Sequence, residues 1–142
     1  MYNSRMENES SLRVIICGDR HWKNRDIVFQ FVRKLPSNSL VIAGGATGAD
    51  SLAAEAAQYF GLRCRVFPAD WNQYGRRAGP IRNRQMLNEG NANLVVAFHA
   101  DLANSKGTKD MVRAAQQKGV KVILYNGVRF AELSPTSVDP VS

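Results

Sequence analysis

Residues 39–60 read SLVIAGGATGADSLAAEAAQYF, and this stretch decides the fold. The β-branched run over 39–43 predicts a buried strand, and two consecutive glycines stop it. From 50 to 60, apolar residues recur at the spacing of one helical face, and Gly61 follows where a helix C-cap glycine belongs. The stretch therefore predicts a strand, a tight turn and an amphipathic helix.

The same alternation recurs along most of the chain. Each apolar run ends at turn residues, and a helical pattern follows it. Because consecutive parallel strands need crossover helices, the pattern predicts an α/β three-layer sandwich with a five-stranded, mostly parallel sheet. The expected strands are 12–17, 39–43, 63–67, 93–98 and 121–125, and the expected helices are 24–35, 50–60, 80–89 and 108–118.

Length and composition agree with one globular domain. The chain has 142 residues, of which 44% are hydrophobic and 22% charged. No apolar stretch approaches the ~18 residues of a membrane span, and the polar start of the chain is unlike a secretory signal, so we expect no membrane partner and a cytoplasmic protein. We expect a disordered leader over 1–11, a single domain over 12–126 and a flexible tail over 127–142.

The charge balance indicates an anionic partner. The formal net charge is +7, which fits nucleotide phosphates, nucleic acid, or solubility alone. Two histidines and two cysteines without a CxxC spacing offer too few zinc ligands, so we expect neither a metal nor a cofactor. We expect Cys17 and Cys64, which lie in apolar runs, to be reduced thiols in the core.

The glycine-rich segment 44–50 (GGATGAD) is the strongest functional signal. Ligands of open parallel α/β sheets bind at the carboxyl ends of the strands, an edge that we call the rim. Gly44, Gly45 and Gly48 would let backbone N–H groups approach a phosphate at a helix start, and Thr47 would add a hydroxyl. The alternative is a tight turn without a ligand. The segment matches neither GxGxxG nor the P-loop.

Other loops at the rim carry residues of matching chemistry. Guanidinium groups bind phosphate, aromatic rings stack on bases, and carboxylates accept from ribose hydroxyls. The alternatives are a solvated basic loop, a capped helix start, and carboxylates that only stabilise helix N-termini. The candidates are Gly18, Asp19, Arg20, Arg76, Arg82, Asn83, Ser105, Gly107 and Thr108 for the ligand and its phosphate, Asp50 and Asp110 with Asp19 for ribose, and Trp22 and Trp71 for the base.

Four motifs in a fixed order carry a family resemblance. They are GDRHW from residue 18, GGATGADSLA from 44, PADWNQYGRRAGPIRNRQM from 68 and VVAFHADLANSKGTKDMVRAA from 95. Over about 12–125 the chain resembles the SLOG superfamily of SMF/DprA proteins and LOG phosphoribohydrolases, and in particular its small stand-alone YspA/YpsA-related branch. The resemblance implies a Rossmann-like domain that binds nucleotide-derived ligands, and a homo-oligomer.

The resemblance also implies roles for single residues. Segment 44–50 matches the phosphate-binding glycine motif of the superfamily, and Ser105, Gly107 and Thr108 match its second, Gly-Thr motif. Arg82 falls where related enzymes carry a basic substrate-binding residue. LOG enzymes have PGGxGTxxE, but the position of the Glu is Met111 here, and Asp110 lies roughly 100° away around the helix.

We therefore expect a protein that binds an ADP-ribose-like, cyclic ADP-ribose-like or nucleoside phosphate ligand as a sensor or sequestering protein, in phage–host defence signalling. The alternative is a LOG-like phosphoribohydrolase that cleaves the N-glycosidic bond of nucleoside 5'-monophosphates, with Asp110 as its carboxylate and Arg82 on the phosphate. A third expectation, a DprA-like single-stranded DNA binder, makes nucleic acid the less favoured partner.

Overall fold

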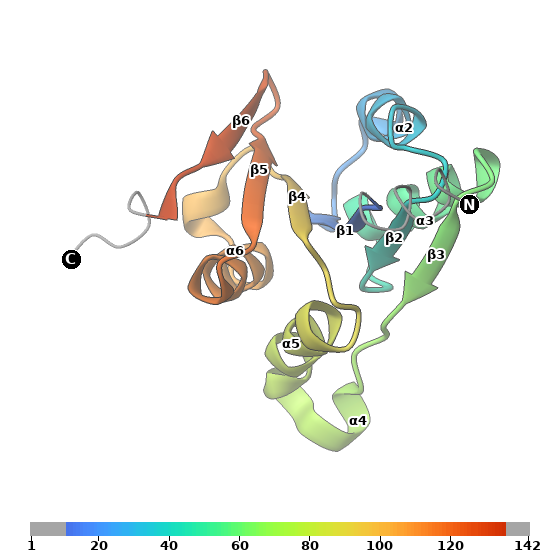
Figure 1. Cartoon of the computed structure of the whole chain (residues 1–142). Coiled ribbons are helices and arrows are strands. Elements are labelled where there is room, and N and C mark those ends of the chain that lie inside the picture. Colours follow the sequence, from blue (N-terminus) through green and yellow to red (C-terminus); the bar gives the residue numbers. More distant parts are fainter. Residues whose placement is uncertain (1–10, 136–142) are drawn as a thin grey trace.

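The computed structural model describes residues 11–135, and the expected leader (1–11) and tail (127–142) extend beyond that range. Strands and helices alternate along the chain (Figure 1). The strands are β1 (Arg13–Gly18), β2 (Leu40–Ala43), β3 (Arg63–Val66), β4 (Leu94–Phe98), β5 (Lys121–Tyr125) and β6 (Phe130–Leu133). The helices are α2 (Arg25–Arg33), α3 (Ala49–Tyr59), α4 (Trp71–Tyr74), α5 (Ala78–Asn88) and α6 (Gly107–Lys118), with 3-10 turns η1 (Gly75–Arg77) and η2 (Leu102–Asn104).

The strands form one sheet in the order β3-β2-β1-β4-β5-β6. Every neighbouring pair is parallel except β5 and β6, which are antiparallel. The predicted α/β fold with a mostly parallel sheet is confirmed, but the expected count of five strands is wrong. The sixth strand, β6, lies inside the segment that we expected to be a flexible tail, where Phe130 packs its ring 4.7 Å from that of Tyr125.

The centre of the sheet consists of β1 and β4, which are apolar because helices cover both of their faces. All five residues of β4 are buried. Strand β3 lies at the edge, and its four residues are exposed, in agreement with the solvated edge that its arginines predict. The expectation for the cysteines is correct for Cys17, which is buried, and wrong for Cys64, which lies exposed on β3.

Two helical layers enclose the sheet (Figure 1). On one face, Val28 and Val32 of α2 and alanines of α3 pack on β1, β2 and β4. On the other face, Met86 of α5 and Met111 of α6 pack on the same strands. Asn24 caps α2 as its sequence predicts, accepting a hydrogen bond from the N–H of Ile27. None of the described helices is long and apolar enough to cross a lipid bilayer.

The strand order reverses between β1 and β4. From β1 the chain proceeds outward to β2 and β3, then returns through α4, η1 and α5 to β4 on the other side of β1. The sequence predicts an irregular loop before residue 80, but this segment contains α4 and η1, and α5 begins at Ala78. The crossover places the first turn of α5 at the rim, where the β1, β2 and β4 loops also end.

Candidate functional site

The first glycine turn (residues 44–48) joins β2 to α3 by a close backbone approach. Gly45 and Gly48 have φ angles of +82° and +75°, a region that side-chain-bearing residues rarely adopt. A Cβ atom on Gly48 would collide with backbone atoms of Asp19 and Arg20 in the loop after β1. Gly48 is therefore required both by its conformation and by the neighbouring loop.

Hydrogen bonds fix this turn to the neighbouring loops. The N–H of Ala49 donates to the carbonyl of Asp19 at 3.1 Å, and the Thr47 hydroxyl donates to the carbonyl of Arg20 at 3.1 Å. The N–H of Asp19 donates to the carbonyl of Phe98 at the end of β4, at 2.9 Å. The loops after β1, β2 and β4 thus form one connected surface at the rim.

Asp50 and Arg82 hold the turn from its inner side. A Cβ on Gly44 would lie 2.8 Å from the Asp50 carboxylate, with the Arg82 guanidinium equally near. The N–H of Ala46 donates to Asp50 Oδ2 at 3.3 Å, and Arg82 Nη1 donates to the carbonyl of Gly44. Burial raises the pKa of Asp50 to about 6, although Arg82 and backbone hydrogen bonds favour its ionised form. Asp50 thus binds the turn itself.

Three N–H groups of the first glycine turn remain open. Among residues 11–135, no protein acceptor binds the N–H of Gly45, Thr47 or Gly48. Gly45 and Thr47 are exposed, and α3 starts directly after them with its positive dipole end. These N–H groups can donate hydrogen bonds to an oxyanion that enters from solvent.

The second glycine turn (residues 105–108) is constructed differently. The hydroxyl of Ser105 accepts from the N–H of Thr108 at 3.1 Å and from that of Lys109 at 3.4 Å. A Cβ on Gly107 would meet nothing within 4 Å. Thr108 is buried against the body of the protein. Ser105 thus takes two N–H groups at the start of α6, while within residues 11–135 no protein acceptor binds those of Lys106 and Gly107.

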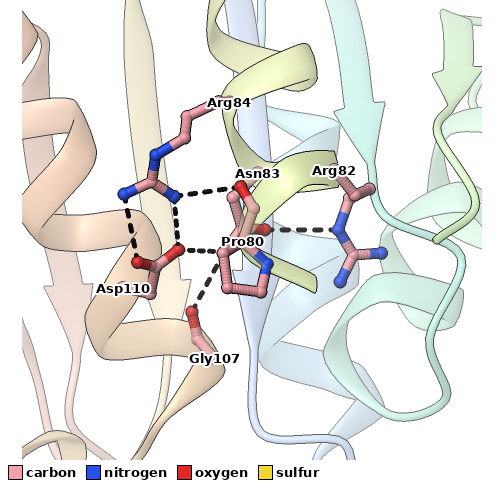
Figure 2. A network of polar contacts seen from close by, with 6 residues as sticks. All are labelled: Pro80, Arg82, Asn83, Arg84, Gly107 and Asp110. Carbon is pink, nitrogen blue, oxygen red and sulfur yellow. Dashed lines mark hydrogen bonds and ion pairs between the residues drawn. The ribbon is translucent and has the colours of Figure 1, made fainter. Parts of the chain in front are cut away.

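Asn83, in the second turn of α5, connects the two glycine turns, and Figure 2 shows its bonds to Arg82, Gly107 and Asp110. Its Oδ1 accepts from Arg82 Nε at 3.2 Å. Its Nδ2 donates to the carbonyl of Gly107 at 3.3 Å and to Asp110 Oδ2 at 3.0 Å. Because Asn83 is only 5% exposed, these bonds satisfy a buried side chain.

Asp110 forms a bidentate ion pair with Arg84 (Figure 2). The two guanidinium nitrogens of Arg84 lie 2.8 and 3.1 Å from Asp110 Oδ2 and Oδ1. Burial raises the pKa of Asp110, but the hydrogen bonds from Arg84 and Asn83 outweigh it and hold that pKa below its ordinary value. The carboxylate is anionic, and its oxygens are already engaged by protein donors.

The two tryptophans differ in exposure. The Trp22 ring packs 5.8 Å from Phe98 and 5.9 Å from Tyr125, and its indole N–H donates to the carbonyl of Asn24. Trp71 at the start of α4 is 59% exposed. Of the two residues expected to stack on a base, only Trp71 presents most of its ring to solvent.

Most of the predicted residues meet at the rim, in two groups. Asp19, Arg20 and the first glycine turn form one group, and the second glycine turn joins Asn83 and Asp110 in the other. Arg76 lies exposed on η1, next in sequence to α4. The sequence did not predict the ion pair of Arg84 with Asp110, because the two residues lie 26 positions apart and no local pattern links them. Within 11–135, no three His, Cys, Asp or Glu side chains gather as metal ligands would.

Comparisons with known proteins agree with this fold. The structure is similar to that of DNA processing protein A (DprA) from Streptococcus pneumoniae, with a TM-score of 0.66 and 15% sequence identity. The match covers 84% of this chain and 52% of that one, so the chain spans about half the length of DprA.

The sequence comparisons identify the family. The Gene 61 protein of Mycobacterium phage D29 is 36% identical over 122 residues, which cover 80% of this chain and 95% of the relative. The model of the YAcAr family (YspA, cpYpsA-related SLOG family) matches residues 12–74, a range that includes the first glycine turn and the loop after β1. With these matches and a DprA-like Rossmann-like fold, the chain belongs to the YspA, cpYpsA-related SLOG family.

Proposed function

We propose that this protein binds a nucleotide-derived ligand at the rim, with a phosphate on the first glycine turn. The observation that carries the proposal is the set of open N–H groups at Gly45, Thr47 and Gly48, directly before the start of α3. Backbone N–H groups at a helix start are a recurring way to bind phosphate. Family membership and the DprA-like fold support a ligand related to nucleotides or DNA.

The charge beneath the turn suits this role. Asp50 lies behind the turn, and its negative charge alone would repel a phosphate. Arg82 offsets that charge, and the hydrogen bonds from Ala46 and Arg82 hold the turn open toward solvent. Asp50 and Arg82 therefore support the turn, and the N–H groups make the contact.

The remaining parts of a nucleotide would lie along the same rim. Asp19 uses Oδ1 to accept from the N–H of His21 at 2.9 Å, which leaves Oδ2 to accept from a ribose hydroxyl. Exposed Trp71 offers a ring face for a base, and Arg76 offers a second cation for phosphate. The ligand class is therefore ADP-ribose-like, cyclic ADP-ribose-like or a nucleoside phosphate.

We infer that the protein binds its ligand as a sensor or sequestering protein and does not cleave it. N-glycosidic hydrolysis needs a carboxylate that can reach the anomeric carbon. Asp110 instead accepts from Arg84 and Asn83 through both oxygens. The similarity to a mycobacteriophage protein supports a role in phage–host defence signalling.

The test is a melting-temperature panel with ADP-ribose, cyclic ADP-ribose, NAD, nucleoside monophosphates and a short DNA oligomer. A ligand at 100 times its dissociation constant stabilises by roughly 2.7 kcal/mol, or about 8 °C for a domain of this size. The Gly45→Asp variant places a carboxylate among the N–H groups. Its affinity for the nucleotide should be at least tenfold lower than that of the parent. Gly45→Asn is the matched control, because it has the same backbone strain and nearly the same volume without the charge.

Two results would overturn the proposal. One is a panel in which no small nucleotide shifts the melting temperature. The other is Gly45→Asp binding as tightly as Gly45→Asn. Release of free base from a monophosphate, abolished by Asp110→Asn, would replace the binding role with hydrolysis.

A further inference from the structure

A hollow of about 490 Å³ lies on the outer side of α6, apart from the first glycine turn. Its lining includes the N-cap residue Lys106 and Lys109, Asp110 and Arg113 of α6, which recur at the spacing of one helical face. The buried residues Met111 and Val112 point to the opposite side, into the core. The rest of the lining is the η2 loop, Ala103, Asn104 and Ser105.

The charge in this hollow is unbalanced. Asp110 is the one acid in the lining, and Arg84 already pairs with it. Within 11–135, the side chains of Lys106 and Arg113 have no ion pair or hydrogen bond with protein. Lys109 donates to the carbonyl of Ala103 at 2.8 Å, a neutral partner that leaves its charge uncompensated. Three cations therefore face a hollow without an available anion.

The arrangement of these cations defines the ligand chemistry. They follow the helix axis over about 10 Å at 1.5 Å per residue, so they form a row. The apolar part of the lining consists of Ala103 and the aliphatic stems of the three cationic side chains, and the lining holds no aromatic ring for a base. Such a row suits neighbouring phosphoryl groups, which are multiply charged and accept from several donors.

We propose that this hollow is a second anion site, which binds neighbouring phosphoryl groups. The source is either a free polyphosphate or the backbone of a single-stranded nucleic acid, since both present the same oxygens. The site lies outside the first glycine turn and does not depend on ligand binding there.

The experiment uses the full chain and two probes: inorganic tripolyphosphate, measured by calorimetry, and a fluorescent twelve-nucleotide thymidine oligomer, measured by anisotropy between about 50 and 200 mM salt. The test variant is Lys106→Gln/Arg113→Gln, which removes two cations that hold no structural contact. The matched control is Arg33→Gln/Lys34→Gln, which removes the same charge from exposed residues at the end of α2, on the opposite face of the sheet.

We expect the test variant to weaken at least one probe by tenfold or more relative to the control. If tripolyphosphate alone is affected, the source is a free polyphosphate. If the oligomer is affected, the slope of log affinity against log salt should shrink by about 1.4, because each lost phosphate contact contributes about 0.7 on a single strand.

The proposal is overturned if neither probe binds the parent, or if both double variants weaken binding equally. It is also overturned if Gly45→Asp removes tripolyphosphate binding and the test variant does not, because the anion would then lie on the first glycine turn. The proposed function would survive that result.

Discussion

The two glycine turns look alike in sequence and differ in construction. Each follows a strand of the central sheet and opens a helix. The first turn has positive φ angles, no room for a Cβ at Gly48, and open N–H groups. At the second turn, Ser105 accepts hydrogen bonds from the N–H groups of Thr108 and Lys109, Gly107 has no positive φ angle, and open space surrounds it. The difference teaches that a glycine before a helix is required by the backbone only where its φ angle is positive or a neighbouring loop leaves no room for a Cβ atom.

The largest expected effect is the loss of stability in Gly48→Ala. The added methyl would enter the backbone of the β1 loop at a φ of +75°, so we expect a loss of about 4 kcal/mol in the free energy of unfolding. Urea denaturation followed by circular dichroism measures it. Gly107→Ala is the control, because its methyl meets nothing and alanine favours a helix; it should change stability by less than about 1 kcal/mol. Equal losses of stability in Gly48→Ala and Gly107→Ala would contradict the difference in construction between the two turns.

A smaller effect is the pH dependence of the free energy of unfolding that arises from Asp50 beneath the first glycine turn. Its folded pKa of about 6 lies above the ordinary value of 3.8. The folded state therefore binds the proton more tightly. The contribution of protonated Asp50 to the free energy of unfolding is complete below about pH 4 and is lost as the pH rises through 6. The loss amounts to about 3 kcal/mol.

Asp50→Asn removes this titration and keeps a carbonyl that can accept from the N–H of Ala46. The free energy of unfolding of Asp50→Asn minus that of the parent should therefore rise between pH 4 and 6 and stay level above pH 7. Denaturation curves at five or six pH values measure this difference. A difference that stays constant across the range would show that Asp50 is not buried beneath the turn as described.

The smallest effect sharpens the description of the second turn. Ser105→Ala removes the hydroxyl that caps α6, so we expect a loss of about 1 kcal/mol in stability. The same variant should leave the affinity for any small nucleotide within twofold, because this serine serves the helix. An affinity loss of tenfold without a stability loss would assign Ser105 to the ligand and contradict the comparison.

The sequence predicted the fold well where local pattern and packing agree. Strands β1, β2 and β4 are apolar because both faces are covered, and their ends lie within two residues of the expected positions. It failed at β6, because FAEL is short and mostly exposed, and becomes a strand only by pairing with β5. It also failed at α4 and η1, which are too short to show a helical period.

The candidate site was predictable in its position but not in its connections. Glycines at strand ends indicated the rim from the sequence alone, since parallel strands place their carboxyl ends together. The roles of Arg82, Asn83 and Arg84 depend on partners 24 to 38 residues away, such as Gly44 and Gly107. Such distant pairs produce no periodic pattern in one sequence. The sequence therefore does not distinguish an arginine that binds protein groups from one that is free to bind a phosphate.

The reversal of strand order also has a consequence for how the chain folds. Strand β1 completes its pairing only with β4, and Val14 lies beside Leu94, far along the sequence. During synthesis, which proceeds from the N-terminus, β1 must keep one edge unpaired until the chain through β4 has been made. Because closing so long a loop costs entropy before any contact rewards it, this pairing should come late and set the folding rate. The central strand of the finished sheet is thus the edge of the nascent one.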